Sequence, residues 1–229
     1  MPNQTQWSAA GARRKLNASL RRTFDALGFE EVETPALVPT PGQEPHINPF
    51  ETSFVPELGQ GRARTLYLHT SPEYAMKRLL ADGSGPLFQV CKVFRNGEAS
   101  AHHNPEFTLL EFYRPGADYR AIMTDLERLL SEAELAVTGT AGRFSRVPYE
   151  RLTVAEAVRR ETGIDLFQHR DGVALRAAAE ARGTRLSPGS RSFEDVFFSS
   201  SCSRSSRSWG TSGRPTCAST PPRWRRWRG

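Results

Sequence analysis

The sequence predicts an α+β fold in which helices are interleaved with antiparallel hairpins. Two strand-like runs, residues 87–95 and 107–114, are joined by the polar loop 96–106, an arrangement typical of a long antiparallel hairpin. Two longer stretches, residues 8–27 and 118–137, carry apolar side chains at helical spacing. The 229 residues are 38% hydrophobic and 24% charged, which is enough for the core of one large domain or about one and a half ordinary ones.

The first helix begins the regular structure of the chain. Its apolar side chains recur on one face, and Gly28 can end it in the left-handed conformation. The residues of this face are Leu16, Leu20, Phe24 and Leu27. Residues 29–34 alternate in hydrophobicity and predict a short strand, which Pro35 ends.

A proline-rich segment separates this strand from the next hairpin. Residues 36–49 hold four prolines and predict an extended loop, and strands at 52–55 and 65–69 follow around a glycine-containing turn. A helix is then predicted from Ser71, an N-cap residue before a proline and an acid, to about residue 80. A Gly-Ser-Gly-Pro break separates this helix from the long hairpin.

Helices predominate after the long hairpin. Asp118 is predicted to cap the helix that ends near residue 137. Four side chains of this helix are expected to point inward: Ile122, Leu126, Leu129 and Leu130. Thr153 begins a capping box before another helix. An alanine-rich helix covers residues 171–182, and one more begins at Ser192.

The chain has two compositions, which change at about residue 195. Residues 196–229 contain seven Arg and no Asp, Glu or Lys, so residues 1–195 hold the other 24 basic and all 25 acidic residues, a net charge of −1. The overall charge of +6 therefore lies in the tail and gives no reason to assign nucleic-acid binding to the body. The tail also holds Cys202, Cys217, Trp209, Trp224 and Trp227.

Several classes of protein are excluded by what the sequence lacks. No apolar run approaches the length of a membrane helix, and the N-terminus has no signal-peptide pattern. The 3 cysteines do not form a disulfide scaffold, so we expect a cytoplasmic protein. Neither a glycine-rich nucleotide loop nor a Cys-x-x-Cys or His-Glu-x-x-His motif occurs. His102 and His103 are adjacent in a loop and make a poor metal pair, so no metal site is predicted.

The long hairpin carries the candidate chemistry. By the two-residue period of a strand, one face of its second strand holds Phe107, Leu109, Glu111 and Tyr113. Arg95 ends the first strand and offers a bidentate fork for a phosphate, and Phe107 offers a plane that can stack on a base. Glu111 and Tyr113 can hold an ammonium group. The alternative is a surface hairpin with ordinary ion pairs, which gives a similar pattern.

Four separated motifs resemble one known family. Phe94-Arg95-Asn96-Gly97-Glu98, followed by His103 to Arg114, resembles motif 2 of the class II aminoacyl-tRNA synthetases in their lysine branch. Glu33-Thr34-Pro35 resembles motif 1, and residues 46–52 and 70–77 also match in the right order. Within that branch the sequence is most similar to the lysyl-tRNA synthetase paralogues that attach β-lysine to elongation factor P. The resemblance covers about residues 10–195.

The resemblance implies a role for each matching residue. Ser71, Pro72 and Glu73 would line the amino-acid pocket, where Glu73 would meet the substrate amine. Tyr113, with Glu111 beside it, would bind the second amine of lysine or β-lysine. The catalytic residue would be Arg95, on the α-phosphate of ATP. The remaining ATP-binding residues would be Asn96, Gly97, Glu98, Asn104 and Phe107, the last stacked on adenine.

The function implied is ATP-dependent formation of an aminoacyl adenylate, with Mg²⁺, and transfer of the amino acid to a lysine of elongation factor P. The first helix begins near Met1 and leaves no room for an anticodon-binding barrel, which favours a protein acceptor over tRNA. A homodimer through motif 1 is implied as well. A lysine–tRNA ligase and a non-catalytic remnant are the alternatives. Two departures from the family are Ala99 to His102, where a glycine and a basic residue are usual, and Phe112 in place of Trp.

The fold implied is a mainly antiparallel sheet flanked by helices and incomplete at its C-terminal side. The family's Mg²⁺-binding carboxylates and its motif 3 have no counterpart here, so we expect the chain as written to be inactive or nearly so. Residues 1–198 would be a partial catalytic core and residues 199–229 an aberrant Arg/Ser-rich tail. The tail is either a disordered RNA-binding arm or G/C-rich DNA read out of frame. We favour the second interpretation because a compatible codon choice, read in another frame, resembles the family's continuation.

Overall fold

The computed structural model describes residues 4–44, 47–56, 61–98, 103–184, 186 and 192–197, and the side chains from residue 8 onward. Two compact units, residues 1–149 and 150–229, divide the chain. The domain boundary predicted at residue 198 lies outside the described residues. None of the helices in the described ranges has the length and apolar character needed to cross a membrane.

The first unit is built on a three-stranded sheet with the order β1-β5-β6. Its strands are β1 (Glu30–Glu31), β5 (Leu87–Phe94) and β6 (Glu106–Tyr113). The predicted long hairpin is confirmed: β5 and β6 pair antiparallel from Leu87 opposite Tyr113 to Phe94 opposite Glu106. β1 pairs parallel with β5 and is shorter than the strand predicted over 29–34. These mixed helices and small sheets confirm the predicted α+β class.

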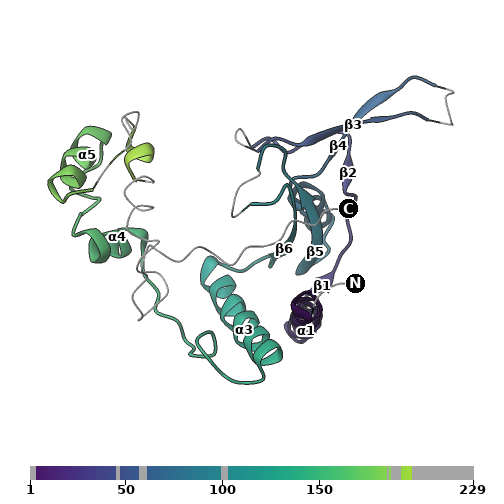
Figure 1. The fold of residues 1–229 in the computed structure, drawn as a ribbon, viewed down its shortest axis with the longest axis horizontal. Helices are drawn as coiled ribbons and strands as arrows, with labels where there is room; N and C mark the ends of the chain where they lie inside the picture. The colour runs from purple at the N-terminus through teal and green to yellow at the C-terminus, as the bar shows by residue number, and fades with distance from the viewer. Residues whose placement is uncertain are drawn as a thin grey trace. The chain divides into compact units, whose positions relative to one another are not determined.

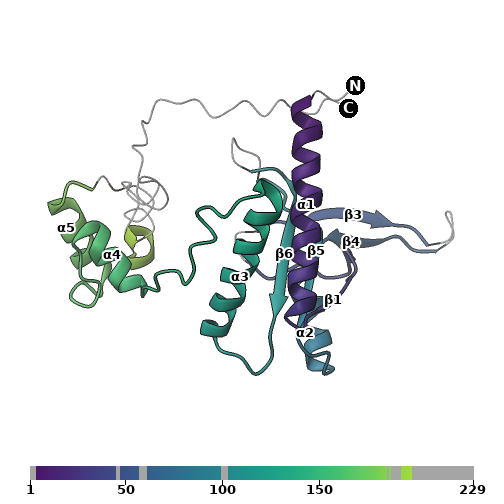
Figure 2. The same ribbon diagram turned by 90° about the horizontal axis from the view of Figure 1, so that it is seen from below.

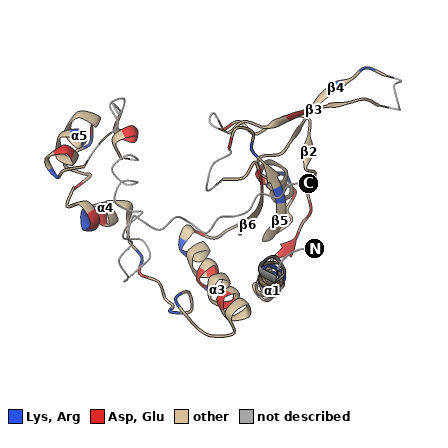
Figure 3. Cartoon of the chain, viewed as in Figure 1, with Lys and Arg blue, Asp and Glu red and all other residues tan. Residues whose placement is uncertain are grey.

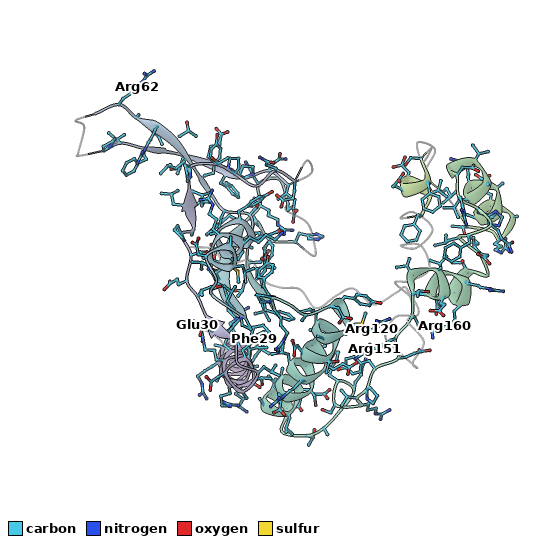
Figure 4. The ribbon with its side chains drawn as sticks, turned by 180° about the vertical axis from the view of Figure 1, so that it is seen from behind. Phe29, Glu30, Arg62, Arg120, Arg151 and Arg160 are labelled. Atoms are coloured by element: carbon cyan, nitrogen blue, oxygen red, sulfur yellow. The ribbon has the colours of Figure 1, made fainter. Side chains whose placement is uncertain are left out.

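A second three-stranded sheet has the order β2-β4-β3 and is antiparallel throughout. Its strands are β2 (Leu37–Val38), β3 (Phe50–Phe54) and β4 (Arg64–Leu68). The prediction that residues 36–49 form only a loop was wrong at β2, whose short pairing with β4 no local pattern shows. Strands β3 and β4 extend as an arm away from the first sheet (Figure 1), and Arg62 lies near the tip of this arm (Figure 4).

His69, which directly follows β4, joins the two sheets. Its backbone N–H donates to the carbonyl of Ala36 at 2.8 Å, and its own carbonyl accepts from the N–H of Phe94 at 3.1 Å. Its Nε2 donates to the carbonyl of Lys92 at 2.7 Å. The side chain is only 4% exposed, so these bonds act with little competition from water. His69 therefore fixes the end of β5 against the second sheet.

Helices α1 (Gln4–Ala26) and α3 (Tyr119–Thr138) lie side by side next to the first sheet (Figures 1 and 2). α1 begins four residues earlier than the pattern predicted, and it ends before Gly28, whose φ of 75° gives the predicted left-handed stop. Asp118 caps α3 as predicted, accepting from the backbone N–H groups of Arg120 and Ala121.

The predicted inward face of α3 was partly wrong. Leu129 is buried, but Leu126 is 44% exposed, and Asp125 and Glu127 are buried instead. The reason is polar pairing: Asp125 accepts two bonds from Arg114, at 2.8 and 3.0 Å. Glu127 accepts from the backbone N–H of Tyr149 at 3.2 Å. Acidic residues recur along α3 (Figure 3), and two of them are structural.

An aromatic cluster holds the sheet against these helices. The ring of Phe24, which is fully buried, stacks on Phe88 at a centroid distance of 4.1 Å and meets Phe29 edge-on at 5.1 Å. Phe112 lies 5.3 Å from Phe24, and Leu129 of α3 completes the buried cluster. Phe112 is thus a packing residue.

The second unit is helical in its described part. It contains α4 (Val154–Thr162), α5 (Gly172–Ala181) and a helical turn at 193–197. The capping box of Thr153 and Glu156 is present as predicted. Its buried core consists of Ile164, Leu175, Ala178, Ala179 and Val196.

Replacing Phe24 by Ala should lower the free energy of unfolding of the first unit by about 3–5 kcal/mol, because it empties the centre of the aromatic cluster. Urea denaturation followed by near-UV circular dichroism measures the change. The matched control is Phe54→Ala, which removes a ring that is already 37% exposed and should cost less than about 1.5 kcal/mol. Equal costs for the two variants would contradict the assignment of the core.

Candidate active site

The two faces of the β5–β6 hairpin carry different kinds of side chain. Phe88, Val90, Leu110 and Phe112 belong to the aromatic cluster. Because side chains alternate along a strand, the opposite face carries the predicted site residues. In β6 these are Phe107, Leu109, Glu111 and Tyr113, and in β5 they are joined by Leu87, Gln89, Cys91 and Val93. The predicted site face is therefore the one turned away from α1 and α3.

Glu111 is the centre of a hydrogen-bonded cluster on this face. Its Oε1 accepts from the Ser71 hydroxyl at 2.5 Å, and its Oε2 accepts from the Tyr113 hydroxyl at 2.9 Å. Burial first, and then the hydrogen bond and charge of Glu111, raise the pKa of Tyr113. Its phenol therefore stays protonated and acts as a donor. The structure thus brings together three of the five predicted substrate-binding residues.

The start of α2 (Glu73–Ala81) supplies the other two. Ser71 was predicted to be the N-cap, but the cap position is Pro72, which is fully buried and caps with no side-chain bond. The Ser71 oxygen accepts from the N–H of Glu73 at 3.0 Å while its proton goes to Glu111. Ser71 therefore connects the first turn of α2 to the Glu111 carboxylate of β6.

The carboxylate of Glu73 has a partner that the sequence analysis did not assign. Lys77, one turn further along α2, donates to Glu73 Oε1 with an Nζ–O distance of 2.5 Å. The spacing of four residues between Glu73 and Lys77 is the signal that could have indicated this pair.

Gln89 and Cys91 were also missed. Gln89 is 2% exposed, lies opposite Glu111 in the register and accepts from the Thr34 hydroxyl at 2.9 Å. Burial and the charge of Glu111 raise the pKa of Cys91 to about 11, against the lowering effect of a hydrogen bond with Gln89. A glutamine between apolar neighbours in a strand was the available signal, since a buried amide needs a partner.

Arg95 lies at the other end of the same face. Its guanidinium carbon is 5.1 Å from the centroid of the Phe107 ring, and its Nη1 is 3.8 Å from Glu98 Oε1. Its Nε is buried and, in the structure, has no hydrogen-bond partner. A buried guanidinium N–H without an acceptor fits an anion such as a phosphate oxygen. Phe107, the ring predicted to stack on adenine, is thus in contact with Arg95, the residue predicted to bind the phosphate.

Backbone bonds fix the position of Arg95. Its N–H donates to the carbonyl of Pro105 at 2.8 Å, and the N–H of Asn96 donates to that of Asn48 at 2.7 Å. Gly97 has a φ of 85°, which only glycine adopts without strain. Asn104 is exposed two residues before β6 begins. Residues 99–102, including the predicted departure from the family and His102, lie outside the described residues.

The two ends of the face are well separated along β6. Phe107 and Glu111 are four residues apart on a strand, which corresponds to about 14 Å. An anion site with an aromatic plane thus lies at one end, and a carboxylate held by neutral donors lies at the other. The described residues contain no group of three or more His, Cys, Asp or Glu side chains suited to a metal ion.

Known proteins with similar sequences were found in two comparisons. The family model for class II tRNA synthetases (D, K and N) matches residues 3–195. Three of the similar proteins serve as examples, and each carries the name elongation factor P–(R)-β-lysine ligase. That of Pseudoalteromonas translucida is 47% identical over 149 residues, which are 64% of this chain and 42% of the relative. That of Pectobacterium atrosepticum is 41% identical over 191 residues, which are 80% of this chain and 54% of the relative. That of Salmonella paratyphi B is 42% identical over 167 residues, which are 73% of this chain and 48% of the relative. The chain spans about half the length of these relatives.

Cys91 should react about a hundredfold more slowly with iodoacetamide at pH 8 than an unperturbed thiol, because its pKa of about 11 leaves little thiolate. Mass spectrometry of the Cys91 peptide, followed against pH, measures the rate. Since the thiol pKa is raised, reactivity should increase through pH 10 and beyond, and Glu111→Gln should move the profile to lower pH. A midpoint near 8.5 in the unaltered chain would contradict the burial of the Cys91 thiol and its proximity to the partly buried Glu111 carboxylate.

Proposed function

The chain belongs to the family of class II tRNA synthetases (D, K and N), and we propose that it forms part of the active site of a ligase that activates lysine or β-lysine with ATP. The product of the first step is the aminoacyl adenylate, and the acceptor of the second is a lysine side chain of elongation factor P. The observation that carries this proposal is the placement of Arg95 and Glu111 on one face of one hairpin, with Phe107 beside Arg95.

The geometry supports an extended substrate along this face. A nucleotide would lie at the Phe107 end, with its α-phosphate on the unpaired Nε of Arg95. The amino acid would extend toward Glu111, and the span of about 14 Å is comparable with a lysine joined to a nucleotide through its carboxylate. The specificity at the far end would come from charge, because the Glu111 carboxylate is surrounded by the hydroxyls of Ser71 and Tyr113 rather than by a bonded cation.

The chemistry needs positioning more than covalent help. The substrate carboxylate attacks the α-phosphorus of ATP, the bond to the β-phosphate bridging oxygen breaks, and pyrophosphate leaves. Arg95 would neutralise charge on the α-phosphate in the transition state, and a guanidinium already ordered by Phe107 and Glu98 needs little reorganisation to do so. In the second step the acceptor amine attacks the carbonyl carbon and AMP leaves. Mg²⁺ would supply further charge neutralisation on the phosphates.

The acceptor and the cellular location are proposed from the relatives. Those most similar relatives are named as ligases of elongation factor P and (R)-β-lysine. We therefore favour this protein over tRNA as acceptor, and a cytoplasmic enzyme, because translation factors act in the cytoplasm. The homodimer and the non-catalytic alternative from the sequence analysis stay predictions.

The first test is ligand binding. Isothermal titration of the 229-residue chain with lysine, β-lysine and ATP should show saturable binding. Tyr113→Phe should weaken binding of the diamino acids about tenfold, because a donor that orients Glu111 is lost, while ATP affinity stays unchanged. The matched control is Tyr119→Phe, which alters a tyrosine that is 63% exposed on α3. An equal loss in both variants would contradict the pocket, and no binding of either diamino acid by the unaltered chain would exclude the proposed function.

The second test is transfer of label. The chain is incubated with radiolabelled lysine or β-lysine, ATP and Mg²⁺, and with either elongation factor P or total tRNA. Because the chain as written is expected to be inactive or nearly so, at most a trace of label on elongation factor P is the expected outcome, and Arg95→Lys should lower that trace further, because an ammonium cannot replace a bidentate guanidinium. Robust labelling would contradict the expected inactivity. Label on tRNA alone would favour the lysine–tRNA ligase. Pyrophosphate exchange measured in the same samples separates a failure of adenylation from a failure of transfer.

A further inference from the structure

The ion pair between Glu73 and Lys77 is part of the Glu111 cluster. The Lys77 Nζ lies 2.5 Å from Glu73 Oε1, and the backbone N–H of Glu73 donates to Ser71 Oγ, which in turn donates to Glu111. The hydrogen bond with Glu73 is the main cause that raises the pKa of Lys77, and the charge of Glu111 acts in the same direction. The charge of Glu73 likewise contributes to the raised pKa of Tyr113. The four side chains that influence one another's charge, Glu73, Lys77, Glu111 and Tyr113, therefore share one electrostatic environment.

The charges of this cluster are unequal at its two ends. Glu111 is bonded to two neutral hydroxyls, whereas Glu73 is bonded to an ammonium group. A diamino acid has two ammonium groups and matches two carboxylates. Among the described residues no cation is bonded to one of these, Glu111, while the other is already neutralised from within the chain.

We propose that the Lys77 ammonium occupies a position on Glu73 that the substrate also uses. In the bound state this position would hold the substrate's first amine, the one nearer to the substrate's own carboxylate, so a diamino acid displaces Lys77 on binding. The inference rests on the proposed function and adds a residue that competes with the substrate for Glu73. Lys77 is well suited to leave, because its side chain is 56% exposed and its ammonium group has water as an alternative partner.

Displacement adds a cost to the binding of the first amine. An amino acid with only the first amine must exchange one ammonium for another on Glu73 and gains little. An amino acid that also has the distal amine bears the same cost and offsets it through the contact with Glu111. Lys77 would therefore lower the affinity of every ligand that carries the first amine by the same factor, and would leave the ratio of the lysine and norleucine affinities unchanged.

An ordinary ion pair on a helix surface has the same geometry, since glutamate and lysine four residues apart stabilise a helix. The two interpretations differ in one consequence. A surface pair affects only the stability of α2, whereas an occupied amine position affects the affinity of ligands that carry the first amine. Three ligands separate the contributions: lysine has both amines, norleucine has only the first, and 6-aminohexanoate has only the distal one.

The experiment measures the dissociation constants of these three ligands by isothermal titration of the full chain. Lys77→Met should tighten lysine and norleucine about fivefold, the factor expected from the loss of a partly exposed ion pair, and should leave 6-aminohexanoate unchanged. Lys77→Arg should behave as the unaltered chain because the charge is kept. The matched control is Lys92→Met: Lys92 is also 56% exposed and pairs with Glu106 at 3.0 Å on the opposite face of the hairpin.

Each outcome decides the inference. Selective tightening of lysine and norleucine in Lys77→Met, absent from Lys92→Met, supports it. Unchanged or weaker binding of lysine in Lys77→Met, by a chain that circular dichroism shows to be folded, overturns the inference and leaves the proposed function standing. Equal tightening of all three ligands overturns it too, because a general change in charge then explains the effect. An unaltered chain that binds neither lysine nor β-lysine overturns the proposed function and this inference together.

Discussion

The antiparallel pairing of β5 with β6 is the constraint on which both the core and the candidate site depend. Side chains alternate between the two faces of these strands, so the register that turns Phe88 and Phe112 toward α1 also turns Glu111 and Tyr113 to the other side. A shift of one residue would bury the carboxylate among aromatic rings and expose those rings to water. The hydrophobic cluster on one face therefore determines which side chains lie on the other face.

The ends of the hairpin are held by polar contacts that the aromatic cluster alone would not provide. Arg114, directly after β6, forms two bonds with Asp125 of α3 and lies 4.5 Å from the ring of Phe29. At the opposite end, His69 binds the carbonyl of Lys92, three residues before Arg95. Because buried and partly buried polar groups are costly to leave unpaired, these contacts hold the strand ends in one arrangement. The positions of Arg95 and Glu111 follow from them.

The chemistry of the site comes from what each charged group is paired with. Arg95 keeps a buried N–H without an acceptor, and Glu111 is held by hydroxyl donors that orient it without cancelling its charge. One end is therefore prepared for an anion and the other for a cation. Glu73 differs, since Lys77 of the same helix binds it. Under the proposed function, a substrate amine that binds Glu73 competes with this side chain of the protein.

The sequence by itself determined the hairpin, the caps at Asp118 and Thr153, and the face that carries Glu111, because these depend on periodicity and on contacts within a few residues. It did not determine β2, since a two-residue strand exists only through its partner β4. Nor did it place Leu126 outside and Asp125 inside, which depends on Arg114 eleven residues away. The bond from Ser71 to Glu111 spans 40 residues, and only the tertiary structure decides such a contact, because no local pattern encodes which distant partner a buried polar group will meet.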